Sequence, residues 1–190
     1  RRCHQHSDLG VVDLNSGLAF GGSGICYRCL SQGDPMKRLI LCLLLLTACK
    51  PEAAVPLPVA MTADSTGYFC QMNVLEHPGP KAQIHLASYP GLPLFFSQVS
   101  DAVAYLRMPE QADAVTATYV SDMGAAASWA NPGASNWIAA DKAVFVVGSS
   151  AKGGMDAAEL VPFSDRTKAQ AFADTNGGQV FTFAEIPETI

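Results

Sequence analysis

Two features are scarce in the second part of this sequence, cysteine and positive charge. After Cys49 the chain has one further cysteine, Cys70, so a thiol-bound intermediate would find no second cysteine to resolve it. From Cys49 onward there are 7 of the 12 basic residues but 14 of the 17 acidic ones. This charge balance makes nucleic acid and anionic lipid surfaces poor partners. No conspicuous acid–base constellation is visible either.

The sequence also lacks an apolar run long enough to span a membrane. Its longest one, "MKRLILCLLLLTAC" at 36–49, has a charged start, a short apolar stretch and small residues at its end. These features are typical of a secretory signal. The ending Leu46-Thr47-Ala48-Cys49 resembles a bacterial lipobox, which implies cleavage before Cys49 and a lipid on its sulfur.

A signal peptide acts from the N-terminus, so we expect translation to begin at Met36. Residues 1–35 would then be an over-extended reading frame. Two pairs in this segment have the spacing of zinc or redox ligands, Cys26 with Cys29 and His4 with His6. No ordered pattern surrounds them, and we expect that they are not expressed.

The remaining chain divides into three parts. Residues 36–48 are the predicted signal peptide, and 49–65, with three prolines and little periodicity, are the predicted lipid anchor and tether. Residues 66–190 are the predicted folded domain.

A weak internal repeat predicts the architecture of that domain. The segments "FFSQVSDAVAYL" (95–106) and "PFSDRTKAQAFA" (162–173) align at a constant offset of 67. Each indicates a strand ending in Phe, a serine helix cap and a helix. The first helix has a buried face at helical spacing: Val99, Ala102, Val103 and Leu106. Strand-like runs flank both copies: 81–88, 114–120, 143–149 and 179–186. The predicted fold class is α+β, with two ββαβ modules in one compact domain.

Cys70 and Met72 are the main candidates for chemistry. If "YFCQMNV" (68–74) is extended, both sulfurs lie on one face of the strand. A thiolate with a thioether is a soft ligand set, which favours Cu(I) over magnesium, calcium or manganese. Zinc rarely takes a thioether. The alternative is that both residues are ordinary core, but an unpaired thiol in an oxidising compartment needs a reason to be there.

A third donor is needed, and the sequence leaves it open. Met123 follows a predicted strand and precedes a glycine, and His77 lies on the loop that leaves the Cys-Met segment. We rank Met123 first and His77 second, with Met155, on another loop, and His85, within a predicted strand, behind them. Met61 is assigned to the tether.

The order of these motifs resembles the NosL family. The lipobox and tether are followed by "FCQMNV", "HPGPKAQI", "YVSDM", "GGMDAAELVPF" and "FADTNGGQVFTF". The family consists of lipoprotein accessory factors of nitrous oxide reductase. The resemblance implies a Cu(I) chaperone that supplies the multicopper centre of that reductase and works with an ABC transporter-type maturation complex. It also implies anchoring on the periplasmic side of the envelope, in the outer membrane, and a fold like that of organomercurial lyase. Cys70 and Met72 carry over as copper ligands, and so does Met123.

Two other classes of function compete with a copper carrier that is not an enzyme. A thiol-dependent envelope enzyme would use Cys70 as nucleophile and His77 or His85 as base. A structural lipoprotein that recruits a partner would tolerate the loss of Cys70.

Overall fold

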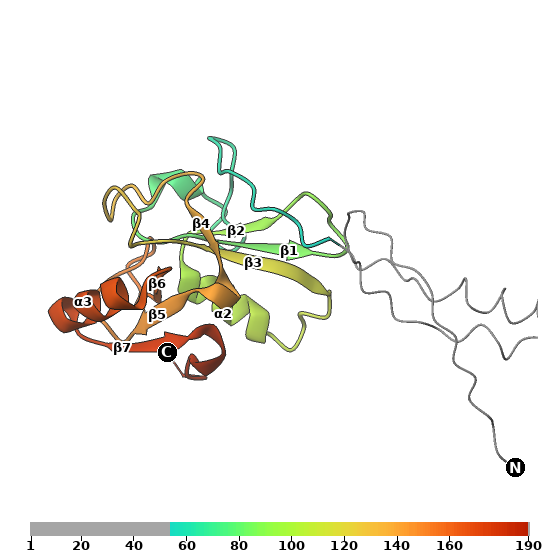
Figure 1. Ribbon diagram of the computed structural model, residues 1–190. Helices are drawn as coiled ribbons and strands as arrows, with labels where there is room; N and C mark the ends of the chain where they lie inside the picture. Colours follow the sequence, from blue (N-terminus) through green and yellow to red (C-terminus); the bar gives the residue numbers. More distant parts are fainter. Residues whose placement is uncertain (1–53, 190) are drawn as a thin grey trace, which may run out of the picture. The chain divides into compact units, whose positions relative to one another are not determined.

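The computed structural model describes residues 54–189 (Figure 1). The predicted signal peptide, Cys49 and residues 1–35 lie outside this range. Among the described residues, no helix is long and apolar enough to cross a membrane.

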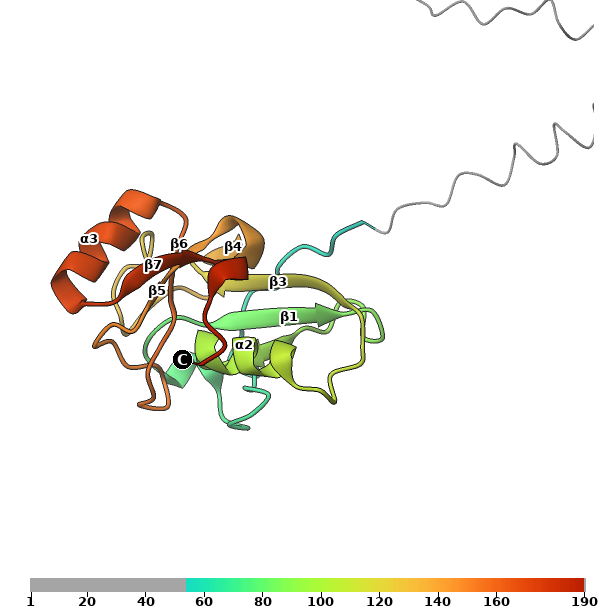
Figure 2. The same cartoon turned by 90° about the horizontal axis from the view of Figure 1, so that it is seen from below.

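The first half of the domain is a four-stranded antiparallel sheet with one helix. The strands lie in the order β2-β1-β3-β4, and each pairs antiparallel with its neighbour. Figure 2 shows the helix α2 running alongside β1 and β3. The elements are β1 (Ala82–Leu86), β2 (Leu94–Phe96), α2 (Val99–Arg107), β3 (Val115–Ser121) and β4 (Trp137–Ala139).

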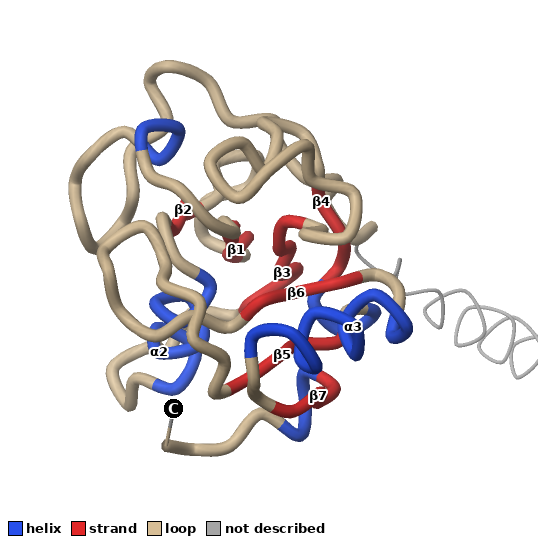
Figure 3. Tube along the Cα trace, turned by 90° about the vertical axis from the view of Figure 1, so that its left-hand side faces the viewer, coloured by secondary structure: helices blue, strands red, loops and turns tan. Residues whose placement is uncertain are grey.

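The second half repeats this plan with a smaller sheet. Its three strands lie in the order β6-β5-β7, again antiparallel, and α3 packs on all three (Figure 3). The elements are β5 (Val144–Val147), β6 (Val161–Phe163), α3 (Arg166–Asn176) and β7 (Gln179–Thr182).

The predicted α+β class with two ββαβ modules is confirmed. In each module the first strand is central, and the second and third strands flank it. The second strands begin at Leu94 and Val161 and the helices at Val99 and Arg166, so both keep the offset of 67 found in the sequence. One expected strand is too long, because Phe183–Glu185 form a 3-10 turn that a Thr182 capping box starts.

The predicted serine caps are wrong. The N-cap of α2 is Gln98, which makes no side-chain cap bond, and the N-cap of α3 is Asp165, whose carboxylate accepts from the Thr167 amide. Ser97 and Ser164 lie one residue earlier, and their hydroxyls bond to residues outside their own helices. The two serine hydroxyls therefore make contacts other than helix caps.

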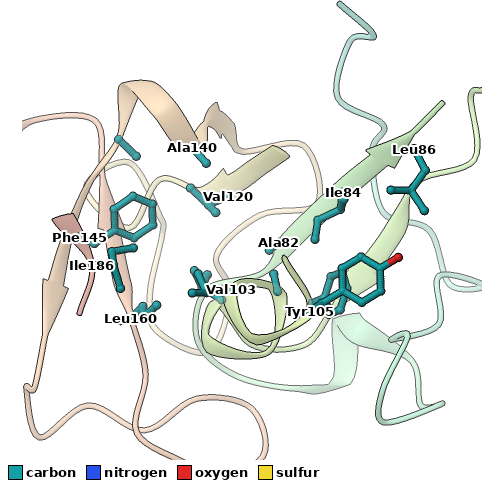
Figure 4. Close-up of a cluster of buried hydrophobic side chains, with 14 residues drawn as sticks. Ala82, Ile84, Leu86, Val103, Tyr105, Val120, Ala140, Phe145, Leu160 and Ile186 are labelled. Atoms are coloured by element: carbon teal, nitrogen blue, oxygen red, sulfur yellow. The ribbon is translucent and has the colours of Figure 1, made fainter. Parts of the chain in front are cut away.

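The main core lies between the two sheets and α2 (Figure 4). Ile84 of β1, Phe145 of β5 and Leu160 are fully buried there. The predicted apolar face of α2 faces this core, with Val99, Ala102 and Val103 buried and Leu106 packed at its margin. Each large apolar side chain buried in this way contributes roughly 1.5–3 kcal/mol. A smaller cluster lies in the second module, around Val146, Val161 and Phe163.

Part of the predicted tether is instead packed on the domain. Gln83 pairs with both backbone groups of Val59, the Tyr119 hydroxyl donates to the Pro56 carbonyl, and Met61 is only 4% exposed. Residues 56–61 therefore form a strap on the first module, so folded structure begins before Thr66. The assignment of Met61 to the tether is wrong.

Candidate metal site

Cys70 and Met72 lie in a tight loop, and the predicted extended strand is wrong. Thr66 and Asn73 form an antiparallel bridge at the base of the loop, and the Gly67 amide donates to the Met72 carbonyl at 2.9 Å. Gln71 has a φ of 57°, in the left-handed region that few side chains adopt. Alternation along a strand thus does not bring the two sulfurs together. They share one loop because the chain reverses there.

Aromatic packing holds this loop against the edge strand β2. The Tyr68 amide donates to the Phe95 carbonyl at 2.7 Å, which occupies a backbone group on the open edge. The rings of Tyr68 and Phe69 pack with centroids 5.9 and 5.6 Å from that of Phe96, and both also contact Tyr105. Aromatic pairs at these separations add stability beyond the area they bury.

Cys70 is half-buried and Met72 is exposed. The Cys70 sulfur lies 2.9 Å from the Ser97 hydroxyl oxygen and 3.9 Å from the Met72 carbonyl. Gly67 permits this approach, because a Cβ there would lie 2.5 Å from the sulfur. The Met72 side chain is 43% exposed, which leaves its thioether free to turn toward an ion beside Cys70.

His77 comes to the same region through Gly154. Its Nδ1 lies 3.1 Å from the Gly154 carbonyl, and a Cβ on Gly154 would be 2.6 Å from the His77 Cβ and 3.0 Å from the Ser97 carbonyl. Ser97 thus contacts Cys70 on one side and adjoins the His77–Gly154 pair on the other. With Nδ1–H donated to a carbonyl, Nε2 is the unprotonated nitrogen that binds metals. That Nε2 is buried and has no partner among the described residues.

The two further methionines, Met123 and Met155, lie in surroundings that differ from each other. Met123 follows β3, its amide donates to the Pro162 carbonyl, and its side chain packs against the smaller core cluster of the second module. Met155 is exposed beside Gly154, and its amide donates to the Gln98 side chain at 2.9 Å. The loop of Met155 therefore adjoins the His77–Gly154 pair, whereas Met123 belongs to the core of the second module.

His85 belongs to another part of the molecule. It is 2% exposed, its Nε2 pairs with Gln83 Oε1 at 2.9 Å, and burial lowers its pKa. Alternation along β1 places it on the face opposite to Ile84, against the strap. There it lines a pocket of about 400 Å³ with Val55 and Pro56.

A buried pair of ionisable residues lies behind the site, and sequence reasoning missed both. Burial lowers the pKa of Lys81 to about 8, while Glu159 and then Cys70 act in the opposite direction. Burial also raises the pKa of Glu159 to about 8, although backbone amides, Ser100's first among them, and Lys81 oppose the shift. The Lys81 ammonium donates to the carbonyls of Pro78 and Gly79, in the loop that follows His77. No sequence pattern marked either residue, because each gains its role from burial.

The donor set suits a soft ion better than a hard one. A thiolate, a thioether and an imidazole prefer Cu(I) to calcium or magnesium. Over residues 54–189, no group of three or more His, Cys, Asp or Glu side chains has the geometry of a metal site. A centre with three side-chain ligands in this part of the chain would therefore need a donor of another kind, such as a methionine sulfur.

A small α+β domain with a thiol and a thioether on one loop, and an imidazole linked to that loop through Ser97 and Gly154, has the make-up of a soft-metal-binding protein. Comparison with known proteins agrees with this. The family model for NosL matches residues 58–190. The chain belongs to the NosL family, which confirms the resemblance found in the sequence.

Individual relatives support the assignment. The copper-binding lipoprotein NosL of Achromobacter cycloclastes is 56% identical over 150 residues, which are 78% of this chain and 77% of the relative. The protein of the same name from Stutzerimonas stutzeri is 34% identical over 133 residues, or 70% and 67% of the two chains. The crystal structure of the copper chaperone NosL from Shewanella denitrificans matches with a TM-score of 0.66 at 32% identity, covering 70% of this chain and 98% of that one.

Proposed function

We propose that this protein carries Cu(I) and delivers it to the multicopper centre of nitrous oxide reductase. Cys70 and Met72 supply the two sulfur ligands. The observation that supports this most strongly is their position on one surface loop, where Cys70 contacts Ser97, the residue that also adjoins the His77–Gly154 pair. The names of the relatives, copper-binding lipoprotein and copper chaperone, favour the same function.

We further propose His77 as the third ligand. Its Nε2 is buried without a partner, and Gly154 and Ser97 connect it to Cys70. Met123 remains the alternative, but its side chain already packs with the second module's core. A Cu(I) ion with one thiolate makes a neutral centre, which suits a site near the buried Lys81 cation.

Transfer of the ion follows from the unequal exposure of the ligands. The Met72 thioether is the weakest and most exposed donor, so it is the first to give way when an acceptor supplies a ligand of its own. A thiol that carries a metal in this way performs no covalent catalysis. The protein on this proposal is not an enzyme, and its partners are the reductase and its ABC transporter-type maturation complex.

The proposal is tested by anaerobic Cu(I) competition against a chromogenic chelator. We use the full chain with its five other cysteines replaced by Ser, here called the single-thiol chain. It should bind one equivalent tightly. Cys70→Ala should lose this binding, and His77→Ala should weaken it more than Met123→Leu does. Equal affinity in the parent and Cys70→Ala would contradict the proposal. A larger loss in Met123→Leu would assign the third ligand to Met123 instead.

We also propose that Cys49 carries a lipid that holds the protein on the periplasmic side of the outer membrane. The lipobox and the word lipoprotein in the names of both relatives support this. Cys49→Ser should move the protein from the membrane fraction to the soluble periplasmic fraction. Retention of Cys49→Ser in washed membranes would show that the anchor is something else.

A further inference from the structure

The Ser97 hydroxyl forms a hydrogen bond with the side chain of Cys70. The residue is 1% exposed, and its oxygen lies 2.9 Å from the Cys70 sulfur. Across residues 54–189 no other side-chain or backbone group is within hydrogen-bond distance of this hydroxyl. A buried hydroxyl without a partner costs free energy, so the hydrogen bond to Cys70 helps to stabilise the fold.

The direction of this hydrogen bond is fixed when the sulfur holds a metal ion. A metal-bound cysteine is a thiolate and has no proton to give, so the hydroxyl must be the donor. A donor to a thiolate withdraws electron density from the sulfur and lowers its donation to the metal. Hydrogen bonds around a cysteine sulfur tune copper centres in this way.

Two neighbours keep the hydroxyl in place. A Cβ on Gly67 would lie 2.9 Å from the Ser97 oxygen and 2.5 Å from the sulfur, so glycine is what allows the two atoms to meet. On the other side, the Ser97 carbonyl adjoins Gly154, next to His77. Ser97 follows β2 directly and precedes α2, so the two elements hold its backbone.

From these contacts we infer that Ser97 is a positioning residue that weakens the bond between Cys70 and Cu(I) and thereby speeds release of the ion. The inference rests on the proposed function. The serine found at the same place in the second module offers a built-in comparison. Ser164 also follows its strand, but its hydroxyl donates to the carboxylate of Asp122.

The inference is tested on the single-thiol chain loaded with one Cu(I). We measure the rate of release to excess chelator and the near-ultraviolet absorption of the Cu(I)–thiolate. In Ser97→Ala, release should slow by about three- to tenfold, the size that one lost hydrogen bond allows. The absorption should move to longer wavelength, because the sulfur becomes richer in electrons. Ser164→Ala should change neither quantity.

A second pair of variants separates the hydrogen bond from packing. Ser97→Thr and Ser97→Val have the same shape, and threonine alone keeps the hydroxyl. Threonine should behave like the parent, and valine should behave like Ser97→Ala. Unchanged absorption and unchanged or faster release in both variants without the hydroxyl would overturn the inference. A failure of the proposed function looks different, since Cys70→Ala would then bind Cu(I) as the parent does.

Discussion

The two modules share one arrangement of strands and helix and differ in the loops attached to it. Phe96 and Phe163 are both buried at the end of the second strand, and Ala102 and Ala169 are both buried in the helix that follows. These positions recur at the offset of 67 because each strand–helix unit must pack in the same way. The loop that carries Cys70 and Met72, in contrast, lies on the first module only. The two modules thus share their core packing, and only the first has the two sulfur ligand candidates on such a loop.

The second module also contributes to the first through a longer connection. The paired residues Ala82 and Phe96 are 14 positions apart, whereas Val144 and Phe163 are 19 apart. The extra length forms a loop whose Met155 amide bonds to Gln98, and Glu159 beyond it accepts from the Ser100 amide in the first turn of α2. The site is therefore shared between the modules, although its sulfurs come from one of them.

The largest difference between the modules should appear when the equivalent phenylalanines are removed. Phe96→Ala should cost about 3–5 kcal/mol of unfolding free energy, and Phe163→Ala should lie at or below the lower end of that range, because its cluster is smaller. Phe96 also supports Tyr68 and Phe69, so its loss should weaken Cu(I) binding as well. Urea denaturation and Cu(I) competition measure the two effects. Equal losses of stability, with copper binding intact in both variants, would break the comparison.

A smaller effect is expected at the two carboxylates that accept from amides at the start of a helix, Glu159 for α2 and Asp165 for α3. Glu159→Ala leaves the half-buried amide of Ser100 and the buried amide of Leu160 without their acceptor and should cost about 2–4 kcal/mol. Asp165→Ala removes an exposed cap of α3 and should cost about 1 kcal/mol. Urea denaturation of both variants at neutral pH compares them. If Asp165→Ala is the more damaging change, the role given to Glu159 is wrong.

The smallest expected effect is a pH dependence that comes from Glu159. Because burial raises the pKa of Glu159 from 4.5 to about 8, the folded protein keeps a proton that the unfolded chain has lost between these values. This contribution to stability is complete below about pH 4.5 and is lost as the pH rises to about 8. Glu159→Gln is neutral throughout and keeps a carbonyl for the cap, so its stability should fall less between about pH 5 and pH 8.

Asp165→Asn makes the corresponding acid-to-amide change at the exposed cap of α3 and serves as the control for that change. The pKa of Lys81 is lowered to about 8, so this lysine acts in the opposite sense and only above that pH. Parallel profiles for Glu159→Gln and the parent would contradict the assignment of the pH dependence to Glu159.

The arrangement of strands and helices was predictable from the sequence, because buried apolar residues recur at regular spacing. The apolar spacing of α2 and the offset of 67 sufficed for two ββαβ modules. The loop of Cys70 and Met72 was not predictable, since Tyr68 and Phe69 have the composition of a strand but pack as anchors of a turn, and strand propensity depends on such context. The sequence also gave no sign of the strap at Met61 or of Glu159, whose contacts are distant in the chain.

The same reasoning explains how far the candidate ligands could be ranked. Cys70, Met72 and His77 are close in sequence, so local spacing could group them. Gly154 and Ser97 connect His77 to Cys70, but these two residues are 57 positions apart in the sequence. No sequence pattern predicts that they meet in the fold. Without these contacts, the sequence places Met123 ahead of His77.

The most direct test of the copper centre is X-ray absorption at the copper edge on the Cu(I)-loaded single-thiol chain. It reports which elements surround the ion without any change to the protein, and Met72→Leu then shows which atom a given sulfur signal comes from. Leucine keeps the volume of methionine, so folding should be affected little. The account predicts two sulfurs and one nitrogen around copper in the parent, and one sulfur fewer in Met72→Leu. Two sulfurs in both proteins would contradict it, and so would a shell of nitrogen and oxygen alone.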